Sequence, residues 1–234
     1  MQPVLGLYLL TGIFSKIATH VPGFPHGVSY FDYVLPAALV TNALDTSLST
    51  GTGLIDELKS GIVARLRSLP ILPSSLLTAR SLTGMIRTAF QALILLTLAQ
   101  LTHGSIYRAG PAALPVSLGL TLLIGWSLGW AFLAASVWLR RAETMQNLGF
   151  TALFLLTFSS SAYVPVTALP TWLSVVAHLN PLTYAINATR SILLQTPGGS
   201  GAILPAVLTS LVIAAAGAFA AVLGFRRPLE ATQR

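Results

Sequence analysis

The chain has 234 residues, of which 54% are hydrophobic and 8% are charged, and its formal net charge is +7. So few charged residues cannot cover the surface of a water-soluble domain, and the composition indicates an all-α integral membrane protein. The chain has no cysteine, which excludes disulfides and thiol catalysis, and no aromatic residues interleave with a basic run, so a nucleic-acid partner is not expected.

The length allows about six membrane crossings of roughly 20 residues each, within a single transmembrane domain over residues 1–234. The first apolar segment ends near Phe14 and falls short of a full crossing, so a truncated first span is expected. Hydropathy and helix breakers predict further spans near 33–55, 81–101, 114–139, 147–164 and 203–225.

The apolar segment at residues 164–195 cannot form one transmembrane helix, because Pro165, Pro170 and Pro181 divide it. Each piece is shorter than a crossing requires. The pattern predicts a hairpin of short helices that re-enters one membrane face between the fifth and sixth spans.

The distribution of basic residues predicts the orientation of these spans. One face of the membrane receives nine of them: Lys59, Arg65, Arg67, Arg80, Arg140, Arg141, Arg226, Arg227 and Arg234. The other face receives Lys16, Arg108 and Arg190. The positive-inside rule therefore places the first face and both termini in the cytoplasm and the hairpin outside. The preference for arginine over lysine hints at a bacterial origin, and hence at the bacterial plasma membrane.

The cytoplasmic segment at residues 54–73 follows the second span. Its amphipathic stretch ends at Pro70. One helical face is apolar, with Leu58, Ile62, Leu66 and Leu69. Such a helix would lie on the membrane and offer Glu57 and Arg65 to a soluble partner. An ordinary interfacial connector explains the pattern equally well.

A polar stripe runs along the second span at i, i+3, i+4 and i+7, formed by Asn42, Asp45, Thr46 and Ser49. A carboxylate within the bilayer is costly unless it is paired or hydrated, so this face should meet a cavity or a buried partner, for which Arg87 in the third span is a candidate. The stripe could line a substrate path or serve packing.

Catalysis and metal binding are not expected. The G-x-S-x-G match at Gly125 to Gly129 lies within a continuous apolar helix, where Gly125 and Gly129 equally suit helix packing. Neither lysine stands in a nucleotide-binding loop. The histidines lack metal-ligand spacing.

Three segments carry a resemblance to a known family: YFDYVLPAALV, DELKSGIVARLRSLPI and the NPLTY-containing hairpin followed by Arg190. With these segments in this order, the chain resembles the permease subunits of type-2 ABC transporters, especially the daunorubicin-resistance branch. The family normally has an amphipathic segment before the first span, and an acidic residue where Lys59 stands.

The resemblance implies an exporter of a hydrophobic or amphipathic, drug-like compound. It implies a dimer with a second permease copy or paralogue, surrounded by membrane lipid, and separate cytoplasmic ABC ATPase subunits that hold the ATP and Mg²⁺; the permease itself binds no cofactor. Coupling to the ATPase is assigned to Glu57, Gly61, Arg65, Leu66 and Pro70, and the external gate to Pro165, Asn180, Pro181, Tyr184 and Arg190. Export of a cell-envelope lipid or glycan is an alternative, as is, in another class, an ATPase-independent carrier or intramembrane enzyme.

Overall fold

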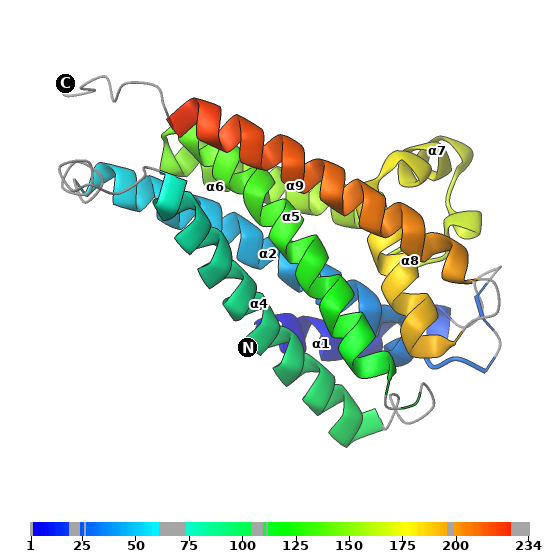
Figure 1. Cartoon of the computed structure of the whole chain (residues 1–234). Helices are drawn as coiled ribbons and strands as arrows, with labels where there is room; N and C mark the ends of the chain where they lie inside the picture. The colour runs from blue at the N-terminus through cyan, green and yellow to red at the C-terminus, as the bar shows by residue number, and fades with distance from the viewer. Residues whose placement is uncertain are drawn as a thin grey trace.

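The computed structural model describes residues 2–18, 24–25, 27–60, 74–103, 110, 112–195 and 199–225. All regular structure within these ranges is helical, which confirms the predicted fold class (Figure 1). The long helices are α1 (Gln2–Ala18), α2 (Tyr30–Lys59), α4 (Ser74–His103), α5 (Ala113–Leu139), α6 (Ala142–Phe158) and α9 (Ile203–Phe225). The shorter elements are η2 (Val166–Ala168), α7 (Thr171–Leu179), α8 (Pro181–Leu194) and η3 (Gly199–Ala202).

Three helices of the described part are long and apolar enough to cross a membrane, over Ser75–Thr102, Ala113–Leu139 and Ile203–Phe225. Helix α1 contains a shorter apolar stretch, Val4–Lys16. Helix α2, with 30 residues, is long enough to cross a membrane, but polar residues such as Asp32 and Asp45 interrupt its apolar sequence. Helix α6 has 17 residues. The count of six spans stays a prediction.

Helix α5 lies at the centre of the bundle and packs against α2, α4 and α9 (Figure 1). The close approach of α9 depends on Gly217, where a Cβ atom would stand 2.7 Å from the carbonyl carbon of Trp130. Gly125 of α5 lies equally close to α2 and α4, since its Cβ would meet Ala43 and Thr88 at 3.2 Å. Gly125 thus serves helix packing. The hydroxyl of Ser127 donates to the carbonyl of Ile124, one turn earlier in the same helix.

One end of the bundle gathers the carboxyl ends of α2, α5 and α9 and the amino ends of α4 and α6 (Figure 1). A buried cluster that includes Leu54, Leu77, Val137 and Phe225 joins α2, α4, α5 and α9 there. Four of the nine basic residues predicted on one face, Lys59, Arg80, Arg140 and Arg141, therefore lie at this end. Arg65, Arg67, Arg226, Arg227 and Arg234 lie outside the described residues.

The apolar segment at residues 164–195 breaks at the predicted prolines. Pro170 precedes α7, and Pro181 is the first residue of α8. Helix α8 packs into the bundle through Leu182 and Ile186, which are fully buried. Helix α7 instead exposes large apolar side chains, with Trp172 70% and Leu179 79% exposed. The re-entry of this hairpin into a membrane stays a prediction.

Candidate functional site

Arg190 lies at the centre of a network that joins α8 to the start of α2 and to the segment after α6. Its Nε donates to the carbonyl of Tyr33 at 3.2 Å, and its Nη2 donates to the carbonyl of Ser161 at 2.8 Å. Its Nη1 donates to Oδ1 of Asn187 at 3.0 Å. The side chain is 7% exposed, and its guanidinium carbon lies 3.7 Å from the centroid of the Tyr33 ring. We call this network the Arg190 clasp.

The Arg190 clasp contains no carboxylate among the described residues. Its oxygen acceptors are the main-chain carbonyls of Tyr33 and Ser161, the more distant carbonyl of Ala162, and one side-chain amide, that of Asn187. A buried guanidinium requires such acceptors, because each unsatisfied N–H would cost free energy. The face of the Tyr33 ring adds an electrostatic attraction for the cation.

Asn180 fixes the break between α7 and α8. Its Oδ1 accepts from the backbone N–H of Leu182 at 2.9 Å and so caps the amino end of α8. Its Nδ2 donates to the carbonyl of Leu156 at 2.7 Å and to Ser159 Oγ at 3.1 Å, which holds the end of α6. Pro181 suits the first position of the helix, where no N–H is required. One buried amide thus orients three helices.

The other two predicted gate residues lie nearby in sequence but have local roles. The Tyr184 hydroxyl donates to the carbonyl of His178 at 2.7 Å and ties α8 to the end of α7. The carbonyl of Pro165 accepts from the N–H of Ala168 at 3.0 Å and begins the turn of η2. Their contacts fix the shape of the hairpin.

The polar stripe of α2 divides between two environments. Asn42 and Thr46 are buried, and the Thr46 hydroxyl lies 2.7 Å from Oε1 of Gln91 in α4. The amide nitrogen of Asn42 is buried without a hydrogen-bond partner in the described part of the chain. Asp45, by contrast, is exposed on the surface of the single chain. The stripe therefore both packs against α4 and presents a carboxylate outward.

Arg87 does not take Asp45 as its partner. Its Nη1 donates to Ser49 Oγ at 3.1 Å, and the described residues include no ion pair between Arg87 and Asp45. Both charged side chains remain exposed on neighbouring helices. The sequence expectation of a neutralised pair is therefore wrong for the single chain.

At the basic end of the bundle, Glu57 forms an ion pair with Arg80 that joins α2 to α4. Nε of Arg80 donates to Oε2 of Glu57 at 2.8 Å, and its Nη2 also donates to the carbonyl of Gly53 at 3.1 Å. The pair lies where the chain leaves α2 and returns in α4, so it fixes the two ends of the intervening segment. Gly61, Arg65, Leu66 and Pro70, the other coupling residues, lie outside the described residues, as does most of the predicted segment 54–73.

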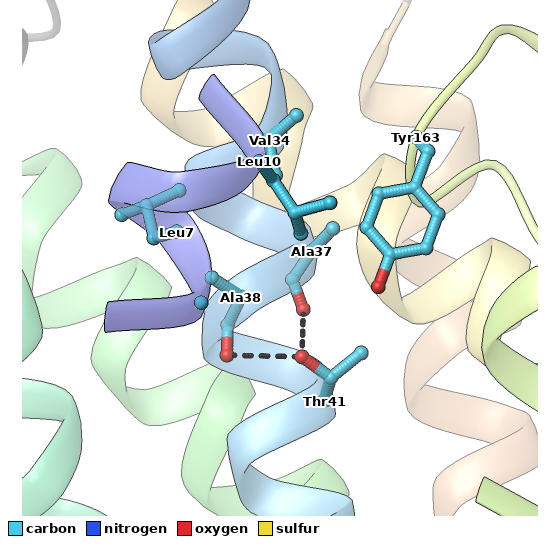
Figure 2. Close-up of a pocket in the computed structure, with 8 residues that line it drawn as sticks. Leu7, Leu10, Val34, Ala37, Ala38, Thr41 and Tyr163 are labelled. Carbon is cyan, nitrogen blue, oxygen red and sulfur yellow. Dashed lines mark hydrogen bonds between the residues drawn. The ribbon is translucent and has the colours of Figure 1, made fainter. Parts of the chain in front are cut away.

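A pocket of about 120 Å³ lies between α1, α2 and Tyr163 (Figure 2). Its walls are mostly apolar, with Leu7 and Leu10 from α1 and Val34 from α2. Sequence reasoning missed this pocket, since small residues on two helices are not distinctive before the helices are placed together. It also missed Tyr33, Arg80 and Asn187 as partners of predicted site residues. Within the described residues, no group of acidic or histidine side chains could hold a metal ion.

Comparisons with known proteins identify the family of the chain. The family model described as ABC-2 type transporter matches residues 1–194. The chain is 28% identical over 200 residues to the daunorubicin resistance ABC transporter permease protein DrrB1 of Streptomyces coeruleorubidus, covering 83% of this chain and 70% of that protein. It is 28% identical over 204 residues to a transport permease designated ycf38 of Porphyra purpurea, covering 84% of this chain and 66% of that protein.

A further relative is named "Probable doxorubicin resistance ABC transporter permease protein DrrC", from Mycobacterium tuberculosis. It is 25% identical over 197 residues, which cover 82% of this chain and 66% of that protein. The chain thus spans about two thirds of the length of these relatives. The family model covers most of the chain, and the relatives that match it carry the names of permeases. The chain belongs to the ABC-2 type transporter family and is a membrane permease of that family.

Proposed function

We propose that this chain is the membrane-spanning subunit of an exporter that moves a hydrophobic or amphipathic, drug-like compound outward, powered by separate ATPase subunits. The observation that carries the proposal is the similarity to permeases whose names give daunorubicin and doxorubicin resistance. The apolar helices and the basic end of the bundle are consistent with it.

In this proposal the helices cross the membrane with the basic end in the cytoplasm. The positive-inside rule gives that orientation, since Lys59, Arg80, Arg140 and Arg141 lie together at one end. If the chain crosses the membrane six times, α7 and α8 lie at the outer face as a re-entrant pair of short helices. The Arg190 clasp would then hold this outer pair against α2.

We place the ATPase contact at the segment between α2 and α4. The ion pair of Glu57 with Arg80 holds the two helix ends together, so a force on the intervening segment would act on both helices. ATP-driven closure of the partner ATPases would push on the segment around Arg65 and tilt the first, second and fifth spans about the dimer interface. A second copy or a paralogue supplies the other half of that dimer.

The candidate path passes the outward-facing part of the polar stripe. Asp45 is exposed beside the contact of Arg87 with Ser49, so a cation, an anion and a hydroxyl lie on one surface of α2 and α4. Charged side chains within a bilayer are costly unless they face a cavity or a partner. We infer that this surface faces the dimer partner or the cargo.

The deciding experiment is affinity purification of the chain from its native membrane, followed by a search for a co-purified ATPase with a Walker motif. We expect such a subunit, with ATPase activity that a drug-like cargo stimulates. Stimulation by a cell-envelope lipid or glycan alone would instead identify the alternative cargo. Retained transport without any ATPase would overturn the proposal in favour of an independent carrier.

Two substitutions test the coupling assignment. Glu57→Ala and Arg65→Ala are expected to lower the cargo-stimulated ATPase activity while membrane insertion stays intact. Asp45→Asn changes a charge of α2 on the candidate path and outside the coupling region, so it serves as a comparison for ATPase binding alone, which it should leave unchanged. Normal stimulation in both coupling variants would remove the assignment.

A further inference from the structure

The pocket between α1 and α2 owes its space to small residues on both helices. Gly6 lines it from α1, and Ala37 and Ala38 line it from α2. A Cβ atom built on Gly6 would meet nothing within 4 Å, so the space beside this residue is open. Gaps in ordinary side-chain packing are rarely larger than a water molecule. The pocket, with a volume of about 120 Å³, is larger than such gaps.

The pocket has one polar side, formed by two hydroxyl groups. The ring of Tyr163 stands across from Ala37, and its hydroxyl is directed toward the end of the pocket where Thr41 lies (Figure 2). Tyr163 is half-buried, and its hydroxyl has no hydrogen-bond partner within the described part of the chain. The Thr41 hydroxyl is used as a donor, since it lies 2.9 Å from the carbonyl of Ala37 and 3.3 Å from that of Ala38.

The two hydroxyls therefore offer different chemistry. Among the described residues nothing accepts from the O–H of Tyr163, and Thr41 keeps acceptor capacity on its oxygen. A ligand group that can both accept and donate, such as a phenolic hydroxyl, would engage both. A purely apolar ligand would leave the tyrosine donor unused.

The volume limits the size of the ligand. An apolar cavity of about 150 Å³ in a protein core accommodates one benzene ring. A pocket of about 120 Å³ that Tyr163 helps to line is close to this size and thus takes one six-membered ring. Water alone is a poor occupant, because it requires two to four polar partners and most residues that line this pocket are apolar.

We propose that this pocket binds a single aromatic ring that carries a phenolic oxygen, with the ring between α1 and α2 and the oxygen at Tyr163. The inference rests on the proposed function in one respect, since it names a feature of the cargo that the exporter recognises. Under the proposed topology the site lies in the outer half of the membrane, away from the ATPase contact.

The test uses 4-fluorophenol as the probe and fluorobenzene as its apolar counterpart. Binding to the purified chain in lipid nanodiscs is followed by ¹⁹F NMR line width, with the signal of protein-free nanodiscs subtracted. We expect Tyr163→Phe to weaken binding of 4-fluorophenol about 5- to 10-fold, the factor associated with one hydrogen bond, and to leave fluorobenzene unchanged.

A glycine pair supplies a matched control. Gly6→Leu fills the pocket and is expected to abolish saturable binding of both probes. Gly12→Leu adds the same side chain to the same helix at a position that also has nothing within 4 Å but does not line the pocket, so binding should be unchanged. Ala38→Val provides a second filling variant if Gly6→Leu does not fold.

Equal effects of Gly6→Leu and Gly12→Leu would overturn the proposal, as would a Tyr163→Phe effect on both probes or on neither. A tightly retained phospholipid with no saturable 4-fluorophenol binding would overturn it too, and would identify an acyl chain as the occupant. The binding assay needs no ATPase. Failure to find an ATPase partner would therefore contradict the export function without affecting this result.

Discussion

The guanidinium of Arg190 lies 3.7 Å above the ring of Tyr33, although 157 residues separate the hydrogen-bonded pair in sequence. The contact joins the only charged side chain of α8 to the first turns of α2. The predicted gate residue therefore acts by holding two distant segments together.

Replacing Arg190 with lysine should destabilise the protein strongly. A lysine keeps the charge but lacks the planar fork that reaches the carbonyls of Tyr33 and Ser161 together. The variant would leave at least one of these buried carbonyls without a donor, so we expect the free energy of unfolding to fall by about 1–3 kcal/mol. Tryptophan fluorescence during denaturation in mixed micelles would measure it. Tyr33→Phe, which keeps the ring and the carbonyl, is the control and should behave as wild type.

Asn180→Ala should cost about 2 kcal/mol of stability, because it removes the cap of α8 and two hydrogen bonds to the end of α6. Asn180→Ser retains an oxygen able to cap α8 but cannot donate to the carbonyl of Leu156. We expect the serine variant to lie between alanine and wild type in thermal unfolding followed by circular dichroism. Equal stability of the two variants would show that the cap contributes little.

Gly217→Ala should separate α9 from α5. Its Cβ would lie within 3.0 Å of main-chain atoms of Trp130 and Ala131, and main-chain atoms cannot move aside without shifting a helix. Overpacking of this kind costs about 1–3 kcal/mol. Gly129→Ala in α5 meets nothing within 4 Å and is the control, which should be neutral or slightly stabilising because alanine favours helix. The unfolding midpoints of the two variants should differ clearly.

The ion pair of Glu57 with Arg80 should contribute modestly to stability. The two side chains are 25–26% exposed, so solvent screens the pair, and a double-mutant cycle with Glu57→Gln and Arg80→Gln should give a coupling energy of about 0.2–1 kcal/mol. The coupling should decrease as salt is added. A coupling that salt does not change would indicate that the pair is shielded from solvent.

Helices and their breaks could be predicted from the sequence because those signals are local. Runs of apolar residues predicted α4, α5 and α9, and Pro181, whose φ angle is fixed by its ring, predicted the start of α8. The four described members of the predicted basic cluster, Lys59, Arg80, Arg140 and Arg141, also lie at one end of the bundle.

Partners across the bundle could not be predicted, because they depend on how helices rotate about their axes. Spacing placed Asp45 and Ser49 on one side of α2, but it could not show that Arg87 reaches the hydroxyl and not the carboxylate. Glu57 was assigned to a soluble partner from its position in a charged segment. The structure pairs it with Arg80 of the next helix, and its contact with a soluble partner stays a prediction.

The acceptors of the Arg190 clasp are all electrically neutral oxygens. Among the described residues neither a carboxylate nor a histidine takes part, and a guanidinium keeps its proton at any physiological pH. Acidification of the surrounding medium therefore has no group to titrate in this network. If the hairpin opens, mechanical displacement of α8 relative to α2 must break these contacts, so the force has to arrive through the helices themselves.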